Sequence, residues 1–208
     1  MTPAALLAHG LGRLGIVLPA GAQPRLLAYL DPLLKWNKTY NLTAIREPQK
    51  MVSHHLLDSL SVARYLVPGS LADVGSGAGL PGIPLAIAQP ERAISLNDAN
   101  HKKATFLRQA AIELRLRNVT IVNARTEDWR PEPLLDCVIS RAFAELADFL
   151  AVCGHLAAPG AQFAAMKGVY PDEELARIPA GFRCEKVVPL DVPFVGAARH
   201  LVLCRREA

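Results

Sequence analysis

The feature that most constrains the fold of this chain is a glycine-rich loop between a short apolar run and a helical one. Within residues 73–82, Gly75, Gly77 and Gly79 stand at alternate positions. Glycines at this spacing let the backbone turn sharply and come close to a ligand, where a Cβ atom would block the approach. Pro81 suits the first position of the following helix. Ligands of open α/β sheets bind beside such loops, at the carboxyl ends of the strands, so the loop predicts a cofactor site.

From residue 71 onward, short strand-like runs alternate with helical ones. This alternation is typical of a mostly parallel sheet with right-handed crossovers. The expected strands are Leu71–Val74, Ala93–Asn97, Val119–Asn123, Asp136–Ser140 and Gln162–Met166, with helices at Pro81–Ala88, Lys102–Leu116 and Glu145–Cys153. Two later runs, Cys184–Leu190 and Leu201–Arg205, have no long helix between them. They predict an antiparallel hairpin at one edge of the sheet.

The first 70 residues read as helical. One helix is expected to open at Pro24, and a second at Pro48, ending near residues 68–69. We therefore predict a doubly wound α/β domain over residues 71–208 with a helical N-terminal cap over residues 1–70, in one compact unit.

Composition narrows the class of protein without fixing its partner. The chain has 208 residues, of which 51% are apolar and 20% charged, as in globular proteins. Its net charge of +4 permits a polyanionic partner but does not demand one. The four cysteines form no C-x-x-C pair, which argues against a zinc site and favours a reduced, cytoplasmic protein. We expect no metal, no membrane span and a monomer.

Two cofactors compete for the loop. The pattern Gly77-x-Gly79-x-x-Gly82 matches the dinucleotide fingerprint, and Asp98 lies about 20 residues further on, where a ribose-binding acid belongs. The longer pattern Asp73-x-Gly75-x-Gly77-x-Gly79 instead resembles the first motif of the class I (Rossmann-like) methyltransferases, which bind S-adenosylmethionine. The carboxylate of Asp73 would oppose a pyrophosphate but suits a cofactor with ammonium and sulfonium groups. We favour a methyltransferase over an NAD(P)-dependent oxidoreductase, with Asp98 at the ribose in either case.

Four stretches of the chain closely resemble the bacterial 16S ribosomal RNA guanine-N7 methyltransferases, the RsmG/GidB family, long called glucose-inhibited division protein B. They are Gly75–Leu85, Trp36–Arg46, His54–Ser59 and Val138–Phe143. The two stretches before the loop have no reason to occur in a generic methyltransferase, so the resemblance is specific. It spans residues 25–168, and it is interrupted at the second strand, where Asn97 shortens the apolar run before Asp98.

The resemblance implies methyl transfer from S-adenosylmethionine to N7 of a guanine in 16S small-subunit ribosomal RNA, at the 530 loop. It also implies cofactor contacts at Gly75, Leu80, Thr126, Glu127 and Arg141. Guanine N7 carries a lone pair and no proton, so the reaction needs positioning groups and no general base.

The positioning groups are expected among polar residues near the strand ends, namely Arg141, Asn41 and Lys167. The expected RNA contacts are Asn37, Lys38, Tyr40, Arg46, His54 and Arg199, and Tyr40 and Phe143 are the aromatics best placed to stack on a guanine. Structural alternatives stay open: asparagines that cap turns, a surface salt bridge at Arg141, and a His54–Asp58 pair on one helix face.

A third class of protein also stays open beside the methyltransferase and the oxidoreductase. It is a non-catalytic RNA-binding protein of ribosome assembly that kept the fold. An altered glycine loop or a lost ribose acid would favour it, and the sequence shows neither.

Overall fold

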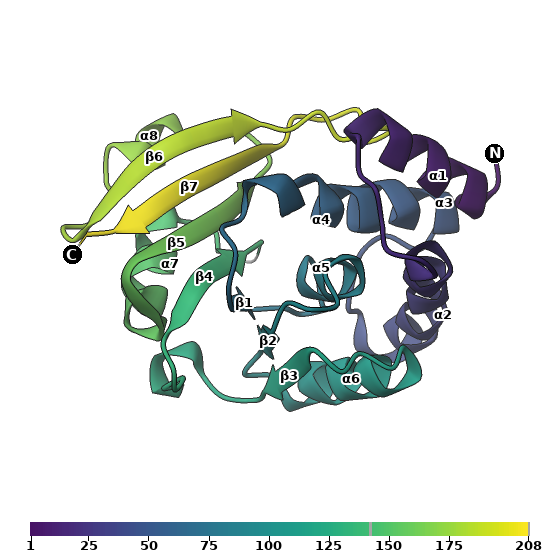
Figure 1. The fold of residues 1–208 in the computed structure, drawn as a ribbon, viewed down its shortest axis with the longest axis horizontal. Coiled ribbons are helices and arrows are strands. Elements are labelled where there is room, and N and C mark those ends of the chain that lie inside the picture. Colours follow the sequence, from purple (N-terminus) through teal and green to yellow (C-terminus); the bar gives the residue numbers. More distant parts are fainter. Residues whose placement is uncertain (142, 208) are drawn as a thin grey trace.

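The computed structural model describes residues 1–141 and 143–207, which form a twisted seven-stranded sheet with helices on both faces (Figure 1). The strand order is β3-β2-β1-β4-β5-β7-β6. The strands are β1 (Leu71–Val74), β2 (Ile94–Asn97), β3 (Val119–Val122), β4 (Leu135–Ser140), β5 (Ala157–Lys167), β6 (Phe182–Pro189) and β7 (His200–Arg206). Each expected strand is present, and β5 begins well before the expected Gln162.

Strands β1 to β5 run parallel, while β7 runs antiparallel to both β5 and β6. The expected edge hairpin is therefore confirmed. Because β7 is reversed, its first residue, His200, pairs with Lys167 at the carboxyl end of β5, while Arg205 pairs with Gln162 toward the other edge. The residues that precede β7 thus join the carboxyl ends of the parallel strands, and those that end it do not.

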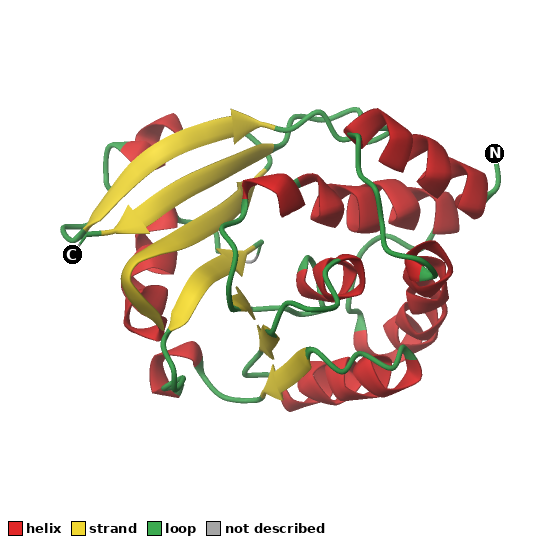
Figure 2. Cartoon of the chain, viewed as in Figure 1, coloured by secondary structure: helices red, strands yellow, loops and turns green. Residues whose placement is uncertain are grey.

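The two faces of the sheet bury separate hydrophobic clusters. Along β1, Leu71 belongs to one cluster, and Ala72 and Val74 belong to the other. Helices α5 (Gly82–Ala88) and α6 (His101–Glu113) cover the first face, and α7 (Leu146–Cys153) and the short α8 (Asp172–Leu175) lie on the second, as Figure 2 shows. Period-two alternation in the strands therefore places β1 between two layers of helices.

The helical cap shares the first cluster. Its helices α1 (Pro3–Leu14) and α2 (Ala22–Tyr40) bury Leu7 and Leu26 there, together with Leu71 of the sheet. At Gly10 a Cβ atom would lie 2.2 Å from Leu57 Cδ1, so this glycine permits the close crossing of α1. Helix α2 begins at Ala22, before the expected Pro24. None of the helices in the described part of the chain is long and apolar enough to cross a membrane.

The helix expected from Pro48 to residues 68–69 is not continuous. It consists of α3 (Pro48–Met51), a π-helical turn η1 (Val52–Leu57), α4 (Asp58–Ser61) and a 3-10 turn η2 (Ala63–Tyr65). A π turn holds more residues than an α turn, so residues four apart no longer lie directly above one another. Such turns occur frequently at functional sites.

Candidate active site

Three glycines of the loop have a left-handed backbone, which allows the sharp turn that their spacing predicted. Gly75, Gly77 and Gly79 have φ values of 68°, 56° and 82°. A Cβ atom at Gly79 would lie 2.4 Å from Ile83 Cδ1, whereas one at Gly77 would meet nothing closer than the Gly75 carbonyl, at 3.8 Å. Gly79 is therefore required by packing against α5. Gly77 instead leaves open space beside the loop, where a ligand can approach the backbone.

Asp73 is a buried carboxylate at the end of β1. Its Oδ2 accepts a hydrogen bond from the backbone N–H of Gly82 at 2.8 Å, and its Oδ1 has no partner among the described residues. Burial raises the pKa of Asp73 to about 7, although the Gly82 hydrogen bond and the positive charge of Arg141 oppose the rise. A positively charged group placed near this oxygen would stabilise the ionised form.

The cap supports the loop through Tyr29 of α2, which the sequence analysis missed. The Tyr29 side chain is fully buried, and its hydroxyl donates a hydrogen bond to the backbone carbonyl of Ala78. Burial raises the pKa of this phenol far above its ordinary value, so the hydroxyl keeps its proton and stays a donor. The helical cap therefore helps to hold the cofactor loop in place.

Asp98 lies opposite the tip of the loop. Its Oδ2 accepts from the backbone N–H of Gly77 at 3.0 Å, and its Oδ1 accepts from Asn100 N–H at 2.8 Å. Lys103 approaches the same carboxylate at 3.9 Å. Asp73 and Asp98 thus end adjacent strands on either side of the glycine loop, as the two-acid pattern predicted.

Asn97 explains the interrupted apolar run before Asp98. Its amide donates to the carbonyls of Val122 and Ala124 at 3.2 and 3.0 Å, and its Oδ1 accepts from the Thr126 hydroxyl at 2.8 Å. The side chain therefore ties the ends of β2 and β3 to the 3-10 turn η3 (Thr126–Asp128). Thr126 is thereby fixed beside the cofactor loop, and the neighbouring Glu127 is exposed.

These residues fit S-adenosylmethionine. The open space at Gly77 leaves room for the amino-acid part of the cofactor next to the loop backbone. The unpaired oxygen of Asp73 offers an acceptor for a positively charged group. Asp98 can still accept hydrogen bonds from hydroxyl groups, because each carboxylate oxygen has two lone pairs and accepts from only one backbone N–H. Leu80 is buried beneath the loop, where it supports the loop from its core side.

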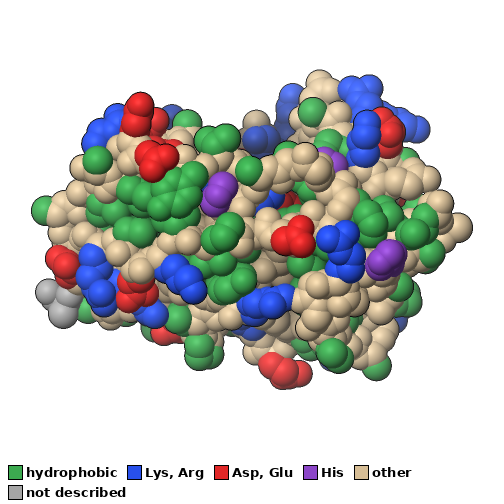
Figure 3. All heavy atoms as spheres, turned by 90° about the horizontal axis from the view of Figure 1, so that it is seen from above, with side chains coloured by type: hydrophobic (Ala, Val, Ile, Leu, Met, Phe, Trp, Pro, Cys, Tyr) green, Lys and Arg blue, Asp and Glu red, His purple; other side chains and the backbone are tan. Residues whose placement is uncertain are grey.

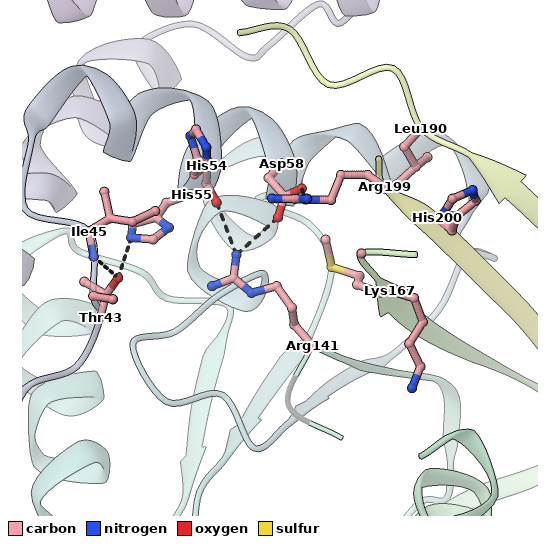
Figure 4. A pocket seen from close by; sticks show the side chains of 13 residues that line it. Thr43, Ile45, His54, His55, Asp58, Arg141, Lys167, Leu190, Arg199 and His200 are labelled. Atoms are coloured by element: carbon pink, nitrogen blue, oxygen red, sulfur yellow. Dashed lines mark hydrogen bonds and ion pairs between the residues drawn. The ribbon is translucent and has the colours of Figure 1, made fainter. Parts of the chain in front are cut away.

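A cavity of about 440 Å³ opens at the carboxyl ends of β4 and β5 (Figure 4). This volume falls in the range of roughly 300–1,000 Å³ that is typical of small-ligand sites. Its walls come from the loop after α2, the π turn, the strand ends and the segment before β7. The lining residues are Thr43, Ala44, Ile45, His54, His55, Asp58, Arg141, Met166, Lys167, Gly168, Leu190, Arg199 and His200.

Two arginines meet on one carboxylate in this cavity. Arg141 Nη1 donates to Asp58 Oδ2 at 3.2 Å and to the His54 carbonyl at 3.3 Å, and Arg199 Nε donates to Asp58 Oδ1 at 3.1 Å. The alternative of a His54–Asp58 pair on one helix face is therefore wrong. The π turn changes the spacing, and the His54 ring bonds the Ser53 hydroxyl instead. Sequence reasoning placed Arg141 and Arg199 near the site but did not connect them.

The loop after α2 forms the wall opposite the arginines. The amide of buried Asn37 exchanges two hydrogen bonds of 2.9 Å with the Thr43 backbone, and the Thr43 hydroxyl bonds His55 Nε2 at 2.9 Å. Burial lowers the pKa of His55 to about 4, which keeps its ring neutral. The expectation that Asn37 contacts RNA is corrected here, because both ends of its amide are used to shape the loop.

Lys167 also departs from its expected role. Its Nζ lies 2.7 Å from Glu174 Oε2 and donates to the Ala144 carbonyl at 2.6 Å. The ammonium group is directed away from the arginines in Figure 4, and the Lys167 side chain is 9% exposed. Because α8 supplies a partly buried acid next to it, Lys167 ties α8 to the segment before α7, and its ammonium group is paired there instead of with the arginines.

The other residues predicted to contact RNA lie near the end of α2 and in neighbouring loops, and they do not form one site. Lys38, Asn41 and Arg46 are exposed, and Asn41 ends α2 in a left-handed conformation. Tyr40 packs on Trp36 at a ring distance of 5.3 Å and leaves 40% of its surface exposed. Phe143 packs against Phe149 at a ring distance of 5.5 Å, at the margin of the second hydrophobic cluster. Their contacts with RNA stay predictions.

Surface charge alone does not mark the site. Figure 3 shows Lys and Arg side chains spread over the visible face, with acidic groups among them and no single basic patch. Arg205 and Arg206 end β7 and bond the carbonyls of Gly160 and Ala157, so they lie away from the cavity. Within the described residues, no group of three His, Cys, Asp or Glu side chains could hold a metal ion.

Solved structures share this fold. A SAM-dependent methyltransferase from Aquifex aeolicus matches with a TM-score of 0.57 and 20% identity, over 85% of this chain and 98% of that one. The ribosomal protein L11 methylase from Lactobacillus delbrueckii matches with a TM-score of 0.54 and 16% identity, over 78% and 80%. At such identities the likeness concerns the fold. Together with the glycine loop and its two acids, it defines the fold class of the Rossmann-like methyltransferases.

Closer relatives identify the family. The model of the GidB family, described as rRNA small subunit methyltransferase G, matches residues 22–202. A protein named Ribosomal RNA small subunit methyltransferase G from Aromatoleum aromaticum is 53% identical, over 98% of this chain and 99% of the relative. One of the same name from Pseudomonas aeruginosa is 50% identical, over 97% and 95%. The chain belongs to the rRNA small subunit methyltransferase G family.

Family membership confirms the predicted enzyme class and its cofactor, S-adenosylmethionine. The oxidoreductase reading of the loop is thereby set aside. The dinucleotide fingerprint matched because both cofactor classes need glycines where the loop turns after the first strand.

Proposed function

We propose that this chain transfers a methyl group from S-adenosylmethionine to N7 of a guanine in 16S small-subunit ribosomal RNA. The guanine of the 530 loop is the position that the family resemblance favours. One observation carries the proposal: the cofactor loop follows β1, the arginine-lined cavity follows β4, and these two strands are paired. A base in the cavity would therefore lie next to the cofactor.

At the cofactor end, Asp98 would bind the ribose hydroxyls, and Thr126 and Glu127 would lie against the adenine. Asp73 would face the amino-acid end of the cofactor, and the open backbone at Gly75 and Gly77 would lie beneath it. When bound, S-adenosylmethionine supplies an electrophilic methyl group. The fixed hydrogen bonds of Asp98 and Thr126 mean that these groups need little reorganisation to bind it.

At the substrate end, the chain has to place N7 in line with the methyl carbon. Guanine N7 has an in-plane lone pair and no proton, so no side chain has to remove one. Arg141 and Arg199 would bind the phosphates of the target nucleotide, since a guanidinium presents N–H donors in a geometry that matches phosphate oxygens. The cavity wall formed by Thr43, Ile45 and Met166 would enclose the base.

Outside the cavity, Lys38, Asn41 and Arg46 would contact the RNA beyond the target nucleotide. These residues are exposed at the end of α2 and in the loop that continues into the cavity wall. Phosphate contacts of this kind fix the register of the RNA but carry no sequence information. The proposed substrate places the reaction in the bacterial cytoplasm, on 16S RNA or on the small subunit.

A modified RNA tests the proposed position of methylation. A 16S fragment whose target guanine is replaced by 7-deazaguanine keeps the shape of the base but has a carbon in place of N7. We expect the purified enzyme to bind both fragments with similar affinity and to transfer labelled methyl groups only to the unmodified one. Equal transfer to both fragments would place the methyl group elsewhere. Binding without transfer to either would favour a non-catalytic assembly role.

A further inference from the structure

Asp58 joins two parts of the cavity that lie far apart along the chain. It belongs to α4 in the helical cap, whereas Arg141 follows β4 and Arg199 precedes β7. Its two carboxylate oxygens accept one hydrogen bond each from the two guanidinium groups, at 3.2 and 3.1 Å (Figure 4). The Asp58 side chain is 3% exposed, and those of Arg141 and Arg199 are 30% and 24% exposed.

This burial is informative about the role of the carboxylate. A carboxylate removed from water is costly unless it is paired and hydrogen-bonded. Two guanidinium groups brought to one cavity would also repel each other without an anion between them. The double ion pair therefore compensates the buried carboxylate and screens the two guanidinium groups from each other. The three groups together keep a net charge of +1.

The arginines keep unused donors that can reach a ligand. Arg141 bonds Asp58 and the His54 carbonyl through Nη1 alone, and Arg199 uses Nε for Asp58 and Nη1 for the Ala198 carbonyl. Over residues 1–141 and 143–207, no hydrogen bond is found for Nη2 of either arginine or for Nε of Arg141. An anion with several oxygens could accept from both groups at once.

We propose that Asp58 is a positioning residue for the RNA substrate: it holds Arg141 and Arg199 together as a two-arginine clamp for a phosphodiester of the target strand. The proposal rests on the proposed function, because it takes RNA as the ligand of the cavity. Asp58 itself touches neither RNA nor cofactor. It acts by fixing the direction in which the two guanidinium groups present their free donors.

The substitution Asp58→Asn tests this clamp, because it keeps the size of the side chain and removes its charge. Simple electrostatics predicts tighter RNA binding, since a negative charge is lost from a site for phosphate. The clamp predicts the opposite: weaker binding of a fluorescent 16S fragment, on the order of tenfold to a hundredfold, as expected for a misplaced positioning group. The slope of log K against log salt should become shallower by about 0.7 for each lost phosphate contact.

Glu185→Gln provides a matched control. Glu185 also bridges two arginines, accepting from Arg183 at 3.1 Å and Arg205 at 3.0 Å, but it lies on the hairpin away from the cavity. This variant should bind RNA with the affinity and salt slope of the unaltered enzyme. Both variants should bind S-adenosylmethionine within about twofold of the unaltered enzyme, since neither carboxylate belongs to the cofactor site.

A double substitution separates positioning from a general structural effect. In an Arg199→Ala background, Asp58→Asn should weaken RNA binding much less than it does alone, because half of the clamp is already lost. If Asp58→Asn binds RNA as tightly as the unaltered enzyme or more tightly, the clamp is refuted. A parallel loss of cofactor affinity would also refute it.

The same measurements keep this inference distinct from the proposed function. Binding of the RNA fragment is measured without methyl transfer, so the clamp is tested even if the enzyme methylates another position. If Asp58→Asn does not fold, Arg199→Gln replaces it. That variant leaves the Arg141–Asp58 pair in place. Its slope of log K against log salt should become shallower by about half of the amount expected for Asp58→Asn, and an unchanged slope would overturn the clamp.

Discussion

The backbone N–H of Gly77 donates to Asp98 Oδ2 at 3.0 Å, so the tip of the glycine loop is held by the acid that ends the next strand. A second bond, from Asn100 to Asp98 Oδ1 at 2.8 Å, fixes the carboxylate from the other side. The residue proposed to bind the cofactor ribose therefore also shapes the loop beneath the cofactor. One side chain sets the relative position of the two cofactor-binding elements.

This double role predicts different effects for two substitutions of Asp98. Asp98→Ala should lower the affinity for S-adenosylmethionine by about two orders of magnitude, because it removes the ribose acceptor and the hydrogen bond that holds the loop. Asp98→Asn keeps one acceptor oxygen and should lose clearly less. Calorimetric titration with the cofactor measures both, and equal losses in the two variants would argue against the loop contact.

The glycines of the loop should separate binding from folding. Gly77→Asp places a side chain in open space next to Asp98, so the fold should persist at a cost of roughly 1–2 kcal/mol for a side chain on the left-handed backbone. Cofactor binding should be abolished by bulk and like charge. Gly79→Ala puts a Cβ atom into Ile83 and should destabilise the fold by about 1–3 kcal/mol. Urea unfolding and cofactor titration of both variants check this, and unchanged cofactor affinity in Gly77→Asp would refute the placement of the site.

Arg141→Ala should reduce methyl transfer on the order of a hundredfold while leaving the fold intact. Asp58 keeps its bond from Arg199 in this variant, so the buried carboxylate is not left unpaired. An exposed salt bridge without a role in the reaction would be worth about 1 kcal/mol of stability or less and would not affect turnover. Transfer at the rate of the unaltered enzyme would therefore remove Arg141 from the site.

The buried carboxyl of Asp73 predicts a pH dependence of stability. Its pKa is about 7 in the folded chain and ordinarily 3.8 for a free aspartate side chain, so the folded state holds the proton more tightly. The unfolded state thus binds fewer protons between about pH 4 and 7, and the contribution of Asp73 to stability falls as the pH rises through this window.

Replacing Asp73 with Asn removes this titration. The free energy of unfolding of Asp73→Asn, measured in urea between pH 5 and 8, should therefore fall less steeply with rising pH than that of the unaltered chain. Parallel curves for the two proteins would show that the Asp73 pKa is not raised.

Much of the fold followed from the sequence because its patterns are local. Strand–helix alternation predicted the sheet, and the glycine loop predicted the cofactor edge. The π turn at Val52–Leu57 could not be predicted in this way, because its residues carry an ordinary helical pattern and its geometry depends on packing against α1. Because of this turn, the expected pairing of His54 with Asp58 on one helix face was wrong.

The parts of the site that were missed depend on contacts between residues distant in sequence. Tyr29 reaches Ala78 across the cap, and Asp58 reaches Arg141 and Arg199 across the cavity. Lys167 was expected in the cleft from its place after β5, but its partner Glu174 belongs to a helix that the sequence did not reveal. Residue type and strand order located the polar groups, and only the fold showed which of them are paired.

The most direct test of the central claim is to map the methyl group. The purified enzyme is incubated with methyl-labelled S-adenosylmethionine and small-subunit RNA from cells that lack this methylation. The RNA is then cleaved with borohydride and aniline, which break the chain at N7-methylguanine. The account predicts label on 16S RNA and a single cleavage at the 530-loop guanine. Labelled 16S RNA that is not cleaved by this treatment, or label on another RNA, would contradict the account.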